Sequence, residues 1–311
     1  MRRLRLRFRA SSAKKDVRRY LRASLALVCG VGLLCSASAC GVAQTPPSAD
    51  IPEGPTIVIA VPGDELGLGY EHEGQYSGFD IEVARYVAQK LGYAHKQIVF
   101  KPVDPSSAAK TLKQSKADMF ISALPSVTTH DAGKRFGTSK PYLTDPLGLL
   151  VPSRLQQDFT DMSSLSNRSI CTVKGTADGH RLSSALPGVR IQERETYPQC
   201  LTALLVGEAN AVAADAAILH GLASSVIEHD VTVLGQGASS SSAPLAQAIA
   251  RVATVRHAVM IRPSNGELTR KINTILHDMV KDGSWRKAAD AMSHDIDYTP
   301  NPTLNPAMAH R

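Results

Sequence analysis

The segment that decides the fold reads GFDIEVARYVAQKL and covers residues 78–91. Its apolar side chains recur at intervals of four, at Phe79, Val83, Val87 and Leu91. This is the spacing of one apolar face of an α-helix. Asp80 stands where a helix cap is expected and Gly92 where a helix ends. The segment therefore predicts an amphipathic helix over residues 80–91.

Strands and helices alternate on both sides of this helix. Upstream, the β-branched run TIVIAV at residues 56–61 has the composition of a buried parallel strand. The other expected strands are 98–100, 117–121, 147–151, 169–173, 189–191, 211–214, 231–234 and 258–261. The other expected helices are 106–116 (with a serine cap), 179–186, 197–207, 215–224, 265–281 and 284–292. We expect a loose loop at 236–244. Repeated β-α alternation predicts an α/β protein of two lobes, each with its own parallel sheet.

The first 40 residues have the layout of an export signal. A basic stretch ending at Arg22 precedes an apolar run at residues 23–34, and small residues follow up to Cys40. An apolar helix of this length is too short to cross a bilayer. The sequence ASAC at 37–40 is similar to a bacterial lipobox, with Ala37 where leucine is usual. We expect a signal peptide at 1–39 and a lipid-anchored Cys40, with simple secretion or an uncleaved anchor as the alternatives. The proline-rich stretch up to Pro55 reads as a tether.

The charge of the chain argues against a nucleic-acid partner. The formal net charge of +7 comes from the leader, because ten Lys and Arg lie in residues 1–22. Without those residues, 25 basic side chains face 27 acidic ones. The rest of the chain therefore carries a slight net negative charge. This disfavours binding to nucleic acid, and it disfavours a polybasic binding surface on this protein.

Two cysteines, Cys171 and Cys200, remain after the leader and the anchor are set aside. An even pair in an exported domain predicts a disulfide, and two buried thiols are the alternative. No CxxC or HxxxH spacing occurs among the cysteines and the ten histidines. We therefore predict no metal site and no cofactor.

The segment at 78–91 resembles the signature of the family 3 extracellular solute-binding proteins. Further pieces in the family's order are Ala117-Asp118, Ser139-Lys140-Pro141-Tyr142, Gly175-Thr176 and Asp282-Gly283-Ser284-Trp285. The resemblance covers about residues 56–296. Within the family, the placement of Cys171 and Cys200 is similar to that in actinobacterial glutamate- or glutamine-binding lipoproteins.

This resemblance implies a two-lobed, type II periplasmic-binding-protein-like fold with a hinge and an interlobe cleft. The implied boundaries are 56–143 plus 257–297 for the first lobe and 146–255 for the second, with a disordered tail at 298–311. Solute would be captured in the cleft and released to an ABC transporter as the hinge opens. The permease and ATPase would be separate chains, and the protein a monomer.

The resemblance also implies residues that hold an amino acid. Asp215, at the end of an expected strand, matches the acid that binds the ammonium group; a helix N-cap is the alternative. The turn Lys174-Gly175-Thr176-Ala177 offers backbone N–H groups and a hydroxyl to a carboxylate, with an ordinary turn as the alternative.

The family's carboxylate clamp is where this chain departs from the pattern. Family members carry Thr-x-Glu-Arg, and the matching residues here are Thr129-His130-Asp131-Ala132. Alanine cannot donate, so Arg135 or His130 would have to substitute. Where the family places a stacking aromatic, this chain has Asp64 and, as the candidate ring, Tyr70.

Two functions of different classes follow. One is a transport receptor for a small polar solute such as glutamate, glutamine or a related compound. The other is a sensor or scaffold lipoprotein with a degenerate cleft. No spacing typical of catalytic residues is present, and the scattered histidines read as surface residues, so an enzyme is not expected.

Overall fold

The structure is a computed structural model of the 311-residue chain. It describes residues 52–125, 136–176, 178–185, 188–226, 230–235, 243–262 and 266–305. The leader, Cys40 and nearly all of the tether lie outside the described residues, as do Thr129, Ala132, Arg135 and Ala177. No helix within the described ranges is long and apolar enough to cross a membrane.

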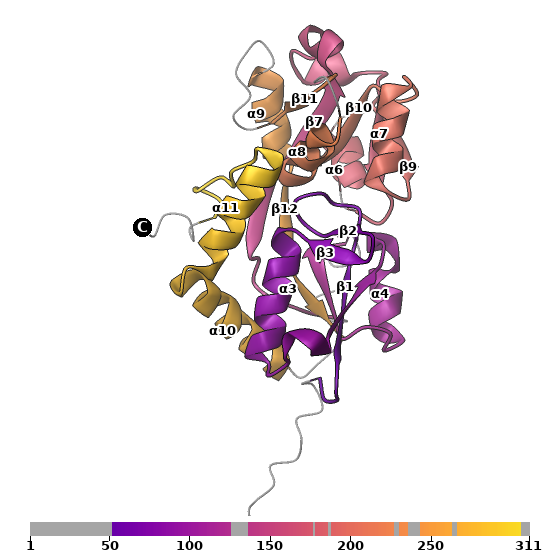
Figure 1. Cartoon of the computed structure of the whole chain (residues 1–311). Helices are drawn as coiled ribbons and strands as arrows, with labels where there is room; N and C mark the ends of the chain where they lie inside the picture. Colours follow the sequence, from indigo (N-terminus) through magenta and orange to yellow (C-terminus); the bar gives the residue numbers. More distant parts are fainter. Residues whose placement is uncertain are drawn as a thin grey trace, which may run out of the picture. The chain divides into compact units, whose positions relative to one another are not determined.

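The first sheet is built around the predicted strand at residues 56–61. Its strands are β4 (Ile98–Pro102), β1 (Ile57–Val61), β5 (Met119–Ala123) and β12 (Thr254–Ile261) in spatial order, with the short β6 (Gly137–Thr138) beside β12. β4, β1 and β5 are parallel, whereas β12 runs antiparallel to β5. The helices are α3 (Phe79–Lys90), α4 (Pro105–Lys113), α10 (Glu267–Lys281) and α11 (Ser284–Ile296). Figure 1 shows α3, α10 and α11 on one side of this sheet and α4 on the other.

Helix α3 begins one residue earlier than predicted and is capped differently. Its N-cap is Gly78, whose φ of 109° favours glycine, and no side chain caps the helix. The expectation that Asp80 caps this helix is wrong, because the Asp80 side chain is buried and accepts a hydrogen bond from the Tyr142 hydroxyl. Likewise α4 is capped at Asp104 and begins with Pro105 rather than with a serine cap.

The second sheet contains the remaining predicted strands. They are β11 (Val231–Leu234), β7 (Leu143–Pro152), β10 (Ala211–Asp215), β8 (Ser169–Val173) and β9 (Arg190–Arg194). β10, β8 and β9 are parallel, but β7 is antiparallel to both β10 and β11. The expectation of a wholly parallel sheet is therefore wrong, as it also is for the first sheet. In each case the antiparallel neighbour is a strand that runs between the two sheets.

Helices cover both faces of the second sheet. They are α6 (Asp178–Ala185), α7 (Tyr197–Leu205), α8 (Ala216–Ser224) and α9 (Ala243–Val252), and 3-10 turns lie at Ser153–Asp158 and Met162–Leu165. Alternate residues of β7 face opposite sides: Leu149 packs in the cluster that holds Leu182 of α6 and Ile249 of α9, and Leu150 in the one that holds Cys200 of α7. Helix α9 was not predicted. It begins at Ala243, inside the expected loose loop at 236–244, and residues 236–242 of that loop lie outside the described residues.

Two strands join the sheets. Residues 143–146 of β7 pair with residues 254–257 of β12, and the rest of β7 pairs with β10 and β11. Beyond His257, β12 pairs with β5 of the first sheet. We call the first sheet with its helices the first lobe and the second sheet with its helices the second lobe. The exact lobe boundaries stay a prediction, because β7 pairs with strands of both sheets and β12 continues from β7 to β5.

The segment after α11 is ordered further than predicted. The Tyr298 hydroxyl donates to Asp145 at 2.7 Å, and the side-chain amide of Asn305 makes two hydrogen bonds of 2.8 Å to the backbone of Thr144. The predicted disordered tail therefore cannot begin at residue 298; residues 306–311 lie outside the described part of the chain. A small hairpin of β2 (Tyr70–His72) and β3 (Gln75–Ser77) was also not predicted.

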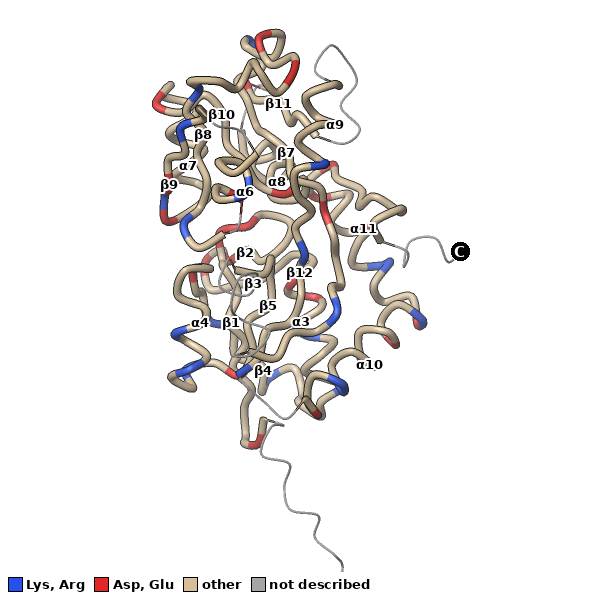
Figure 2. The backbone as a smooth tube through the Cα atoms, turned by 180° about the vertical axis from the view of Figure 1, so that it is seen from behind, with Lys and Arg blue, Asp and Glu red and all other residues tan. Residues whose placement is uncertain are grey.

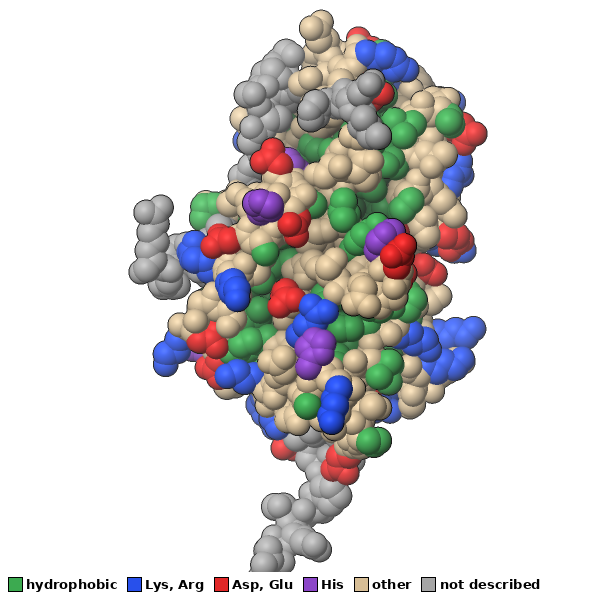
Figure 3. Space-filling view, in the orientation of Figure 1, with side chains coloured by type: hydrophobic (Ala, Val, Ile, Leu, Met, Phe, Trp, Pro, Cys, Tyr) green, Lys and Arg blue, Asp and Glu red, His purple; other side chains and the backbone are tan. Residues whose placement is uncertain are grey.

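Charges of both signs are distributed over the surface. On the face shown in Figure 3, blue and red side chains are interspersed rather than gathered into one basic patch. This agrees with the slightly acidic balance of the chain after its leader.

Candidate functional site

Asp215 lies at the carboxyl end of β10 and at the start of α8. Its Oδ1 accepts the backbone N–H of Ile218 at 3.1 Å, so Asp215 is the N-cap of that helix. The side chain is nearly fully buried, with 1% of the residue exposed. Capping uses one carboxylate oxygen and leaves Oδ2 for another partner. The helix-cap alternative is therefore observed, and it does not exclude a role in binding.

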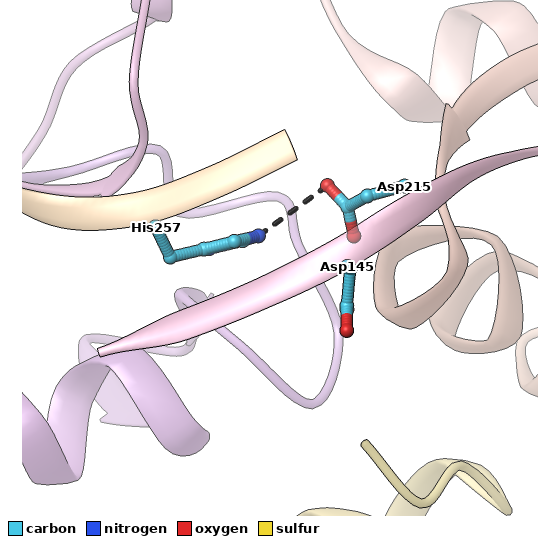
Figure 4. A group of neighbouring side chains, drawn as sticks. All are labelled: Asp145, Asp215 and His257. Carbon is cyan, nitrogen blue, oxygen red and sulfur yellow. Dashed lines mark ion pairs between the residues drawn. The ribbon is translucent and has the colours of Figure 1, made fainter. Parts of the chain in front are cut away.

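His257 supplies that partner from the joining strand β12. Its Nε2 lies 3.4 Å from Asp215 Oδ2, and its Nδ1 lies 3.6 Å from Asp80 Oδ2 (Figure 4 draws the first pair). The residue is fully buried, so the expectation that the histidines are surface residues is wrong for His257. Burial by itself lowers the pKa of His257, but the carboxylates of Asp215 and Asp80 outweigh it and raise that pKa well above its usual value.

Asp80 is held by a second group. The Tyr142 hydroxyl donates to Asp80 Oδ1 at 2.8 Å, and both residues are buried. Tyr142 precedes β7, and its carbonyl oxygen accepts the indole N–H of Trp285 at 2.7 Å. A continuous row of polar contacts thus leads from Tyr142 through Asp80 and His257 to Asp215. It starts in the first lobe and ends in the second.

Asp145 adds a third buried carboxylate beside His257 and Asp215. It lies on β7, and its Oδ1 accepts the Tyr298 hydroxyl at 2.7 Å. Its Oδ2 has no hydrogen-bond partner among the described residues, although Asp145 is fully buried. Burial, and then the negative charge of Asp215, raise the pKa of Asp145 to about 7. One ligating atom each from Asp145, Asp215 and His257 lie within 4.8 Å of one another (Figure 4).

The loop after β1, residues 63–69, reaches from the first lobe to the second. The Asp64 carboxylate accepts the backbone N–H of Tyr197, at the start of α7, at 3.0 Å. The next residue, Glu65, accepts the Ser122 hydroxyl at 3.0 Å. Burial and the nearby carboxylates of Asp64 and Asp80 raise the pKa of Glu65 well above its usual value. Figure 2 shows red stretches of backbone between the elements labelled β2 and α8, at the level where the two lobes meet.

The turn after β8 was predicted to hold a carboxylate. Lys174 is exposed and pairs with Glu195 at 3.2 Å, and the Thr176 hydroxyl donates to the carbonyl of Val173 at 2.7 Å. Gly175 has a φ of 86° and lies against Ser106 of α4, in the other lobe. As placed, the Lys174 and Thr176 side chains make contacts of an ordinary turn. Their role in binding stays a prediction, and Ala177 lies outside the described residues.

Two further residues near this loop and turn are Tyr70, on β2, and Asp178, on α6. Tyr70 is half-buried on β2, and its ring stacks on that of His72 with centroids 6.2 Å apart. Its predicted contact with solute stays untested. Asp178, the first residue of α6, is buried, and burial together with the charge of Asp215 raises its pKa to about 7.

Sequence reasoning missed most of these buried polar residues. It selected Asp215 and Asp64 but gave no site role to Glu65, Asp80, Asp145, Asp178 or His257. A usable signal was present for two of them. Asp145 interrupts the apolar strand LTDPLGLLVP and His257 the strand TVRHAVMI, and charged groups are rarely buried in strands without a specific partner.

The predicted disulfide is present. Cys171 of β8 and Cys200 of α7 are bonded, with their Cα atoms 5.5 Å apart. The bond ties α7, whose first N–H contacts Asp64, to the strand that precedes the Lys174 turn. It therefore stiffens the part of the second lobe that faces the first.

Comparison with known proteins agrees with this arrangement. Residues 57–292 match the family described as bacterial extracellular solute-binding proteins, family 3. The chain belongs to this family. It is therefore an exported protein that binds solute, as the family's description states, and its fold is the two-lobed type II fold that the resemblance implied.

Similar sequences and structures come from several bacteria. The glutamate-binding protein GluB of Corynebacterium glutamicum is 28% identical over 245 residues, which are 76% of this chain and 77% of the relative. The ABC transporter glutamine-binding protein GlnH of Bacillus subtilis is 24% identical over 240 residues, 76% of this chain and 81% of the relative. The amino acid ABC transporter substrate-binding protein AbpA of Streptococcus pneumoniae, solved with L-arginine, superposes with a TM-score of 0.63 at 19% identity, covering 78% of this chain and 97% of that one.

Proposed function

We propose that this solute-binding protein captures an amino acid or a related small cationic solute and delivers it to an ABC importer. The observation that carries the proposal is the position of Asp215, buried where the lobes meet, with Oδ2 turned away from the helix it caps. A carboxylate in such a place is suited to an ammonium group, because charge pairing and hydrogen bonding offset the loss of water. The names of relatives that bind glutamate, glutamine, arginine or cystine support this class of solute.

His257 affects how tightly the solute's ammonium group binds to Asp215. The imidazole lies 3.4 Å from the oxygen that the ammonium group would need. We expect the solute to share or take over this oxygen, so His257 lowers the net charge that Asp215 presents. This chain should therefore bind a single ammonium group less tightly than a site with an unpaired aspartate would.

The anionic end of the solute would be held by the turn at residues 174–177 and by Thr129 and Arg135. Ala132 stands where family members carry the clamping arginine, and it cannot donate a hydrogen bond. We therefore expect weaker binding of plain amino acids than the family's pattern would allow, or a solute with a small anion or none. Asp64 and Tyr70 are further candidate contacts from the first lobe.

The exported form is proposed to be a lipoprotein. Cleavage before Cys40 and lipidation of its thiol would anchor the protein at the outer face of the membrane, with residues 42–55 as tether. The permease and ATPase are proposed to be separate chains and the binding protein a monomer that catalyses no reaction. Mass spectrometry of the mature N-terminus tests the anchor, and Cys40→Ser should release the protein into the medium.

A screen of thermal unfolding with each of the amino acids identifies the solute, and calorimetry then gives its affinity. Asp215→Asn keeps a good N-cap residue but removes the charge, so folding should be retained. Loss of a buried charge partner typically costs about 2 to 5 kcal/mol, which predicts affinity at least roughly 30-fold lower. The control is Asp295→Asn, an exposed aspartate of α11 that also lies beside a histidine. Unchanged affinity in Asp215→Asn would overturn the ammonium assignment.

One observation favours the alternative function, a sensor or scaffold lipoprotein. Asp215 already has two partners in this chain, Ile218 and His257, so its charge is compensated without solute. If no amino acid raises the unfolding temperature of the wild-type protein or of Ala132→Arg, this alternative is supported. If Ala132→Arg creates or strengthens binding of glutamate or glutamine, the protein is an amino-acid receptor that has lost its clamp.

A further inference from the structure

Three buried side chains converge where the two lobes join, and each comes from a different strand. Asp145 lies on β7, Asp215 at the end of β10 and His257 on β12. All three are 0–1% exposed, and one ligating atom from each lies within 4.8 Å of the others (Figure 4). We propose that Asp145, Asp215 and His257 bind one divalent transition-metal ion, with Zn²⁺ as the representative ion.

The donor set fits this class of ion. Two carboxylate oxygens and one imidazole nitrogen are common ligands of Zn²⁺, at about 2.0 to 2.2 Å. Two donors bound to one tetrahedral ion are about 3.4 Å apart. The 3.4 Å between His257 Nε2 and Asp215 Oδ2 already fits. The longer separations, which reach up to 4.8 Å, require the side chains to move together by about 1.4 Å when an ion binds.

The atoms available to an ion are those that the surrounding protein leaves unpaired. Tyr298 occupies Asp145 Oδ1 and the Ile218 N–H occupies Asp215 Oδ1. Among the described residues, Asp145 Oδ2 has no hydrogen-bond partner, and His257 Nε2 has only its ion pair with Asp215 Oδ2 at 3.4 Å, although both residues are fully buried. A buried polar atom without a partner is costly, so Asp145 Oδ2 in particular indicates a missing ligand. An ion between them would satisfy both atoms and Asp215 Oδ2 together.

A supporting shell is also in place behind the histidine. Asp80 Oδ2 lies 3.6 Å from His257 Nδ1, and the Tyr142 hydroxyl holds the other oxygen of Asp80. A carboxylate behind the non-ligating nitrogen of a metal-bound histidine fixes the ring and strengthens the ligand. Asp80 would act as such a positioning residue, leaving Nε2 for the ion.

An ion pair between His257 and Asp215, with no metal ion, accounts for fewer of these contacts. A proton on His257 Nε2 could serve Asp215, but Asp145 Oδ2 would still have no partner. A metal ion takes the place of that proton and reaches the third side chain as well. The spacing rules applied to the sequence could not find this site, because its ligands are 42 to 112 residues apart in the chain.

The proposal goes beyond amino-acid binding and can fail separately from it. An ion and a solute's ammonium group would both use Asp215 Oδ2, so they would compete there. Substitutions of Asp145 and His257 distinguish metal binding from amino-acid binding, because only the metal proposal needs Asp145 as a direct ligand.

The test uses the full exported chain, stripped with a chelator and then given ZnCl₂. We expect one zinc ion per chain by elemental analysis, a higher unfolding temperature, and a visible absorption band when Co²⁺ replaces Zn²⁺. Asp145→Asn keeps the side-chain shape and an oxygen for Tyr298, and it should lower zinc affinity at least 100-fold. His257→Gln should do the same. The matched control, His294→Gln with Asp295→Asn, removes an exposed histidine-aspartate neighbour pair and should change nothing.

The proposal is overturned if the wild-type chain binds no stoichiometric zinc, or if Asp145→Asn binds zinc as tightly as the wild type. The second result would assign the zinc to surface histidines. Circular dichroism of the chelator-treated variants shows whether they fold; should His257→Gln not fold, Asp145→Asn alone still decides the outcome. Amino-acid binding that persists in Asp145→Asn would leave the proposed function intact whichever way the zinc result falls.

Discussion

Gly175 lies directly against the backbone of Ser106: a Cβ atom at Gly175 would be 2.5 Å from the Ser106 nitrogen and 2.6 Å from its Cα. The first residue follows β8 in the second lobe, and the second lies in the first turn of α4 in the first lobe. Together with the Asp64 bond to Tyr197, this contact brings the loops of the two lobes together. Lobe closure should therefore depend on the absence of a side chain at residue 175.

Gly175→Ala is expected to hinder closure and weaken solute binding. A Cβ closer than 3.0 Å to backbone forces a shift, and overpacking typically costs about 1 to 3 kcal/mol, or roughly 5- to 150-fold in affinity. Calorimetry with the amino acid found by screening measures the change. Gly207→Ala is the control, because Gly207 has a similar φ of 81° but no atom of the described part of the chain lies within 4 Å of its Cβ position. Equal affinities in the two variants would contradict the closure argument.

Removing the disulfide should destabilise the protein without unfolding it. The bond closes a loop of 30 residues between Cys171 and Cys200, which is worth about 3.5 kcal/mol in the chain-entropy model. Urea unfolding of the double variant Cys171→Ala with Cys200→Ala measures the loss. Titration of thiols in the denatured, unreduced wild type is the check on the bond itself, and two free thiols would refute it.

Asp178 should make the stability of the protein fall as pH rises. Burial and then the charge of Asp215 raise the pKa of Asp178 to about 7, while Arg181 and His257 oppose the shift and the buried Tyr197 lies nearby. A carboxyl group whose pKa is higher in the folded state binds more protons there than in the unfolded chain. Its contribution to the free energy of unfolding is constant below about pH 4, falls between about pH 4 and 7, and is constant again above that range.

Asp178→Asn should therefore be the more stable protein at pH 8 and nearly equal to the wild type at pH 4. The difference between a pKa of about 7 in the folded protein and the usual value near 4 corresponds to about 4 kcal/mol at full effect. Denaturant unfolding of both proteins between pH 4 and 8 tests this. Parallel pH profiles for the two proteins would show that Asp178 does not titrate in this range.

Asn305→Ala should lower the free energy of unfolding, because Asn305 contacts the strand β7. Asn305 itself lies beyond residues 57–292, which match the family. Its amide accepts the Thr144 N–H and donates to the Thr144 carbonyl, each at 2.8 Å. Its amide nitrogen also donates to the Asn301 carbonyl at 3.0 Å, so three hydrogen bonds are lost, which predicts about 2 to 4 kcal/mol. Thr303→Ala, an exposed neighbour whose side chain makes no such contact among the described residues, serves as control. The single tryptophan, Trp285, reports unfolding by fluorescence, since it is buried and bonded to Tyr142. If Asn305→Ala and Thr303→Ala unfold alike, the tail does not contribute to stability.

Much of the fold could be predicted from local patterns. The helix predicted at 80–91 lies within one residue of the observed start and end of α3, and β8 and β11 coincide with the predicted strands 169–173 and 231–234. Apolar periodicity is a local property, since each residue's face follows from its neighbours three or four positions away. The missed elements, β2, β3 and α9, are short or lie beside a serine-rich stretch, where such periodicity is weak.

The sequence by itself determined the alternation of strands and helices, the pair of cysteines that would bond, the family, and Asp215 as an acid at a strand end. The tertiary structure alone decided that Asp80, Asp145 and His257 meet beside it. The antiparallel pairing of β7 with β12 brings Asp145 and His257 together, and the packing of α3 adds Asp80, which the Tyr142 hydroxyl holds. Whether a charged side chain is buried, and which groups lie beside it, depends on residues that are distant in the sequence. The spacing of residues along the chain therefore does not predict such a site.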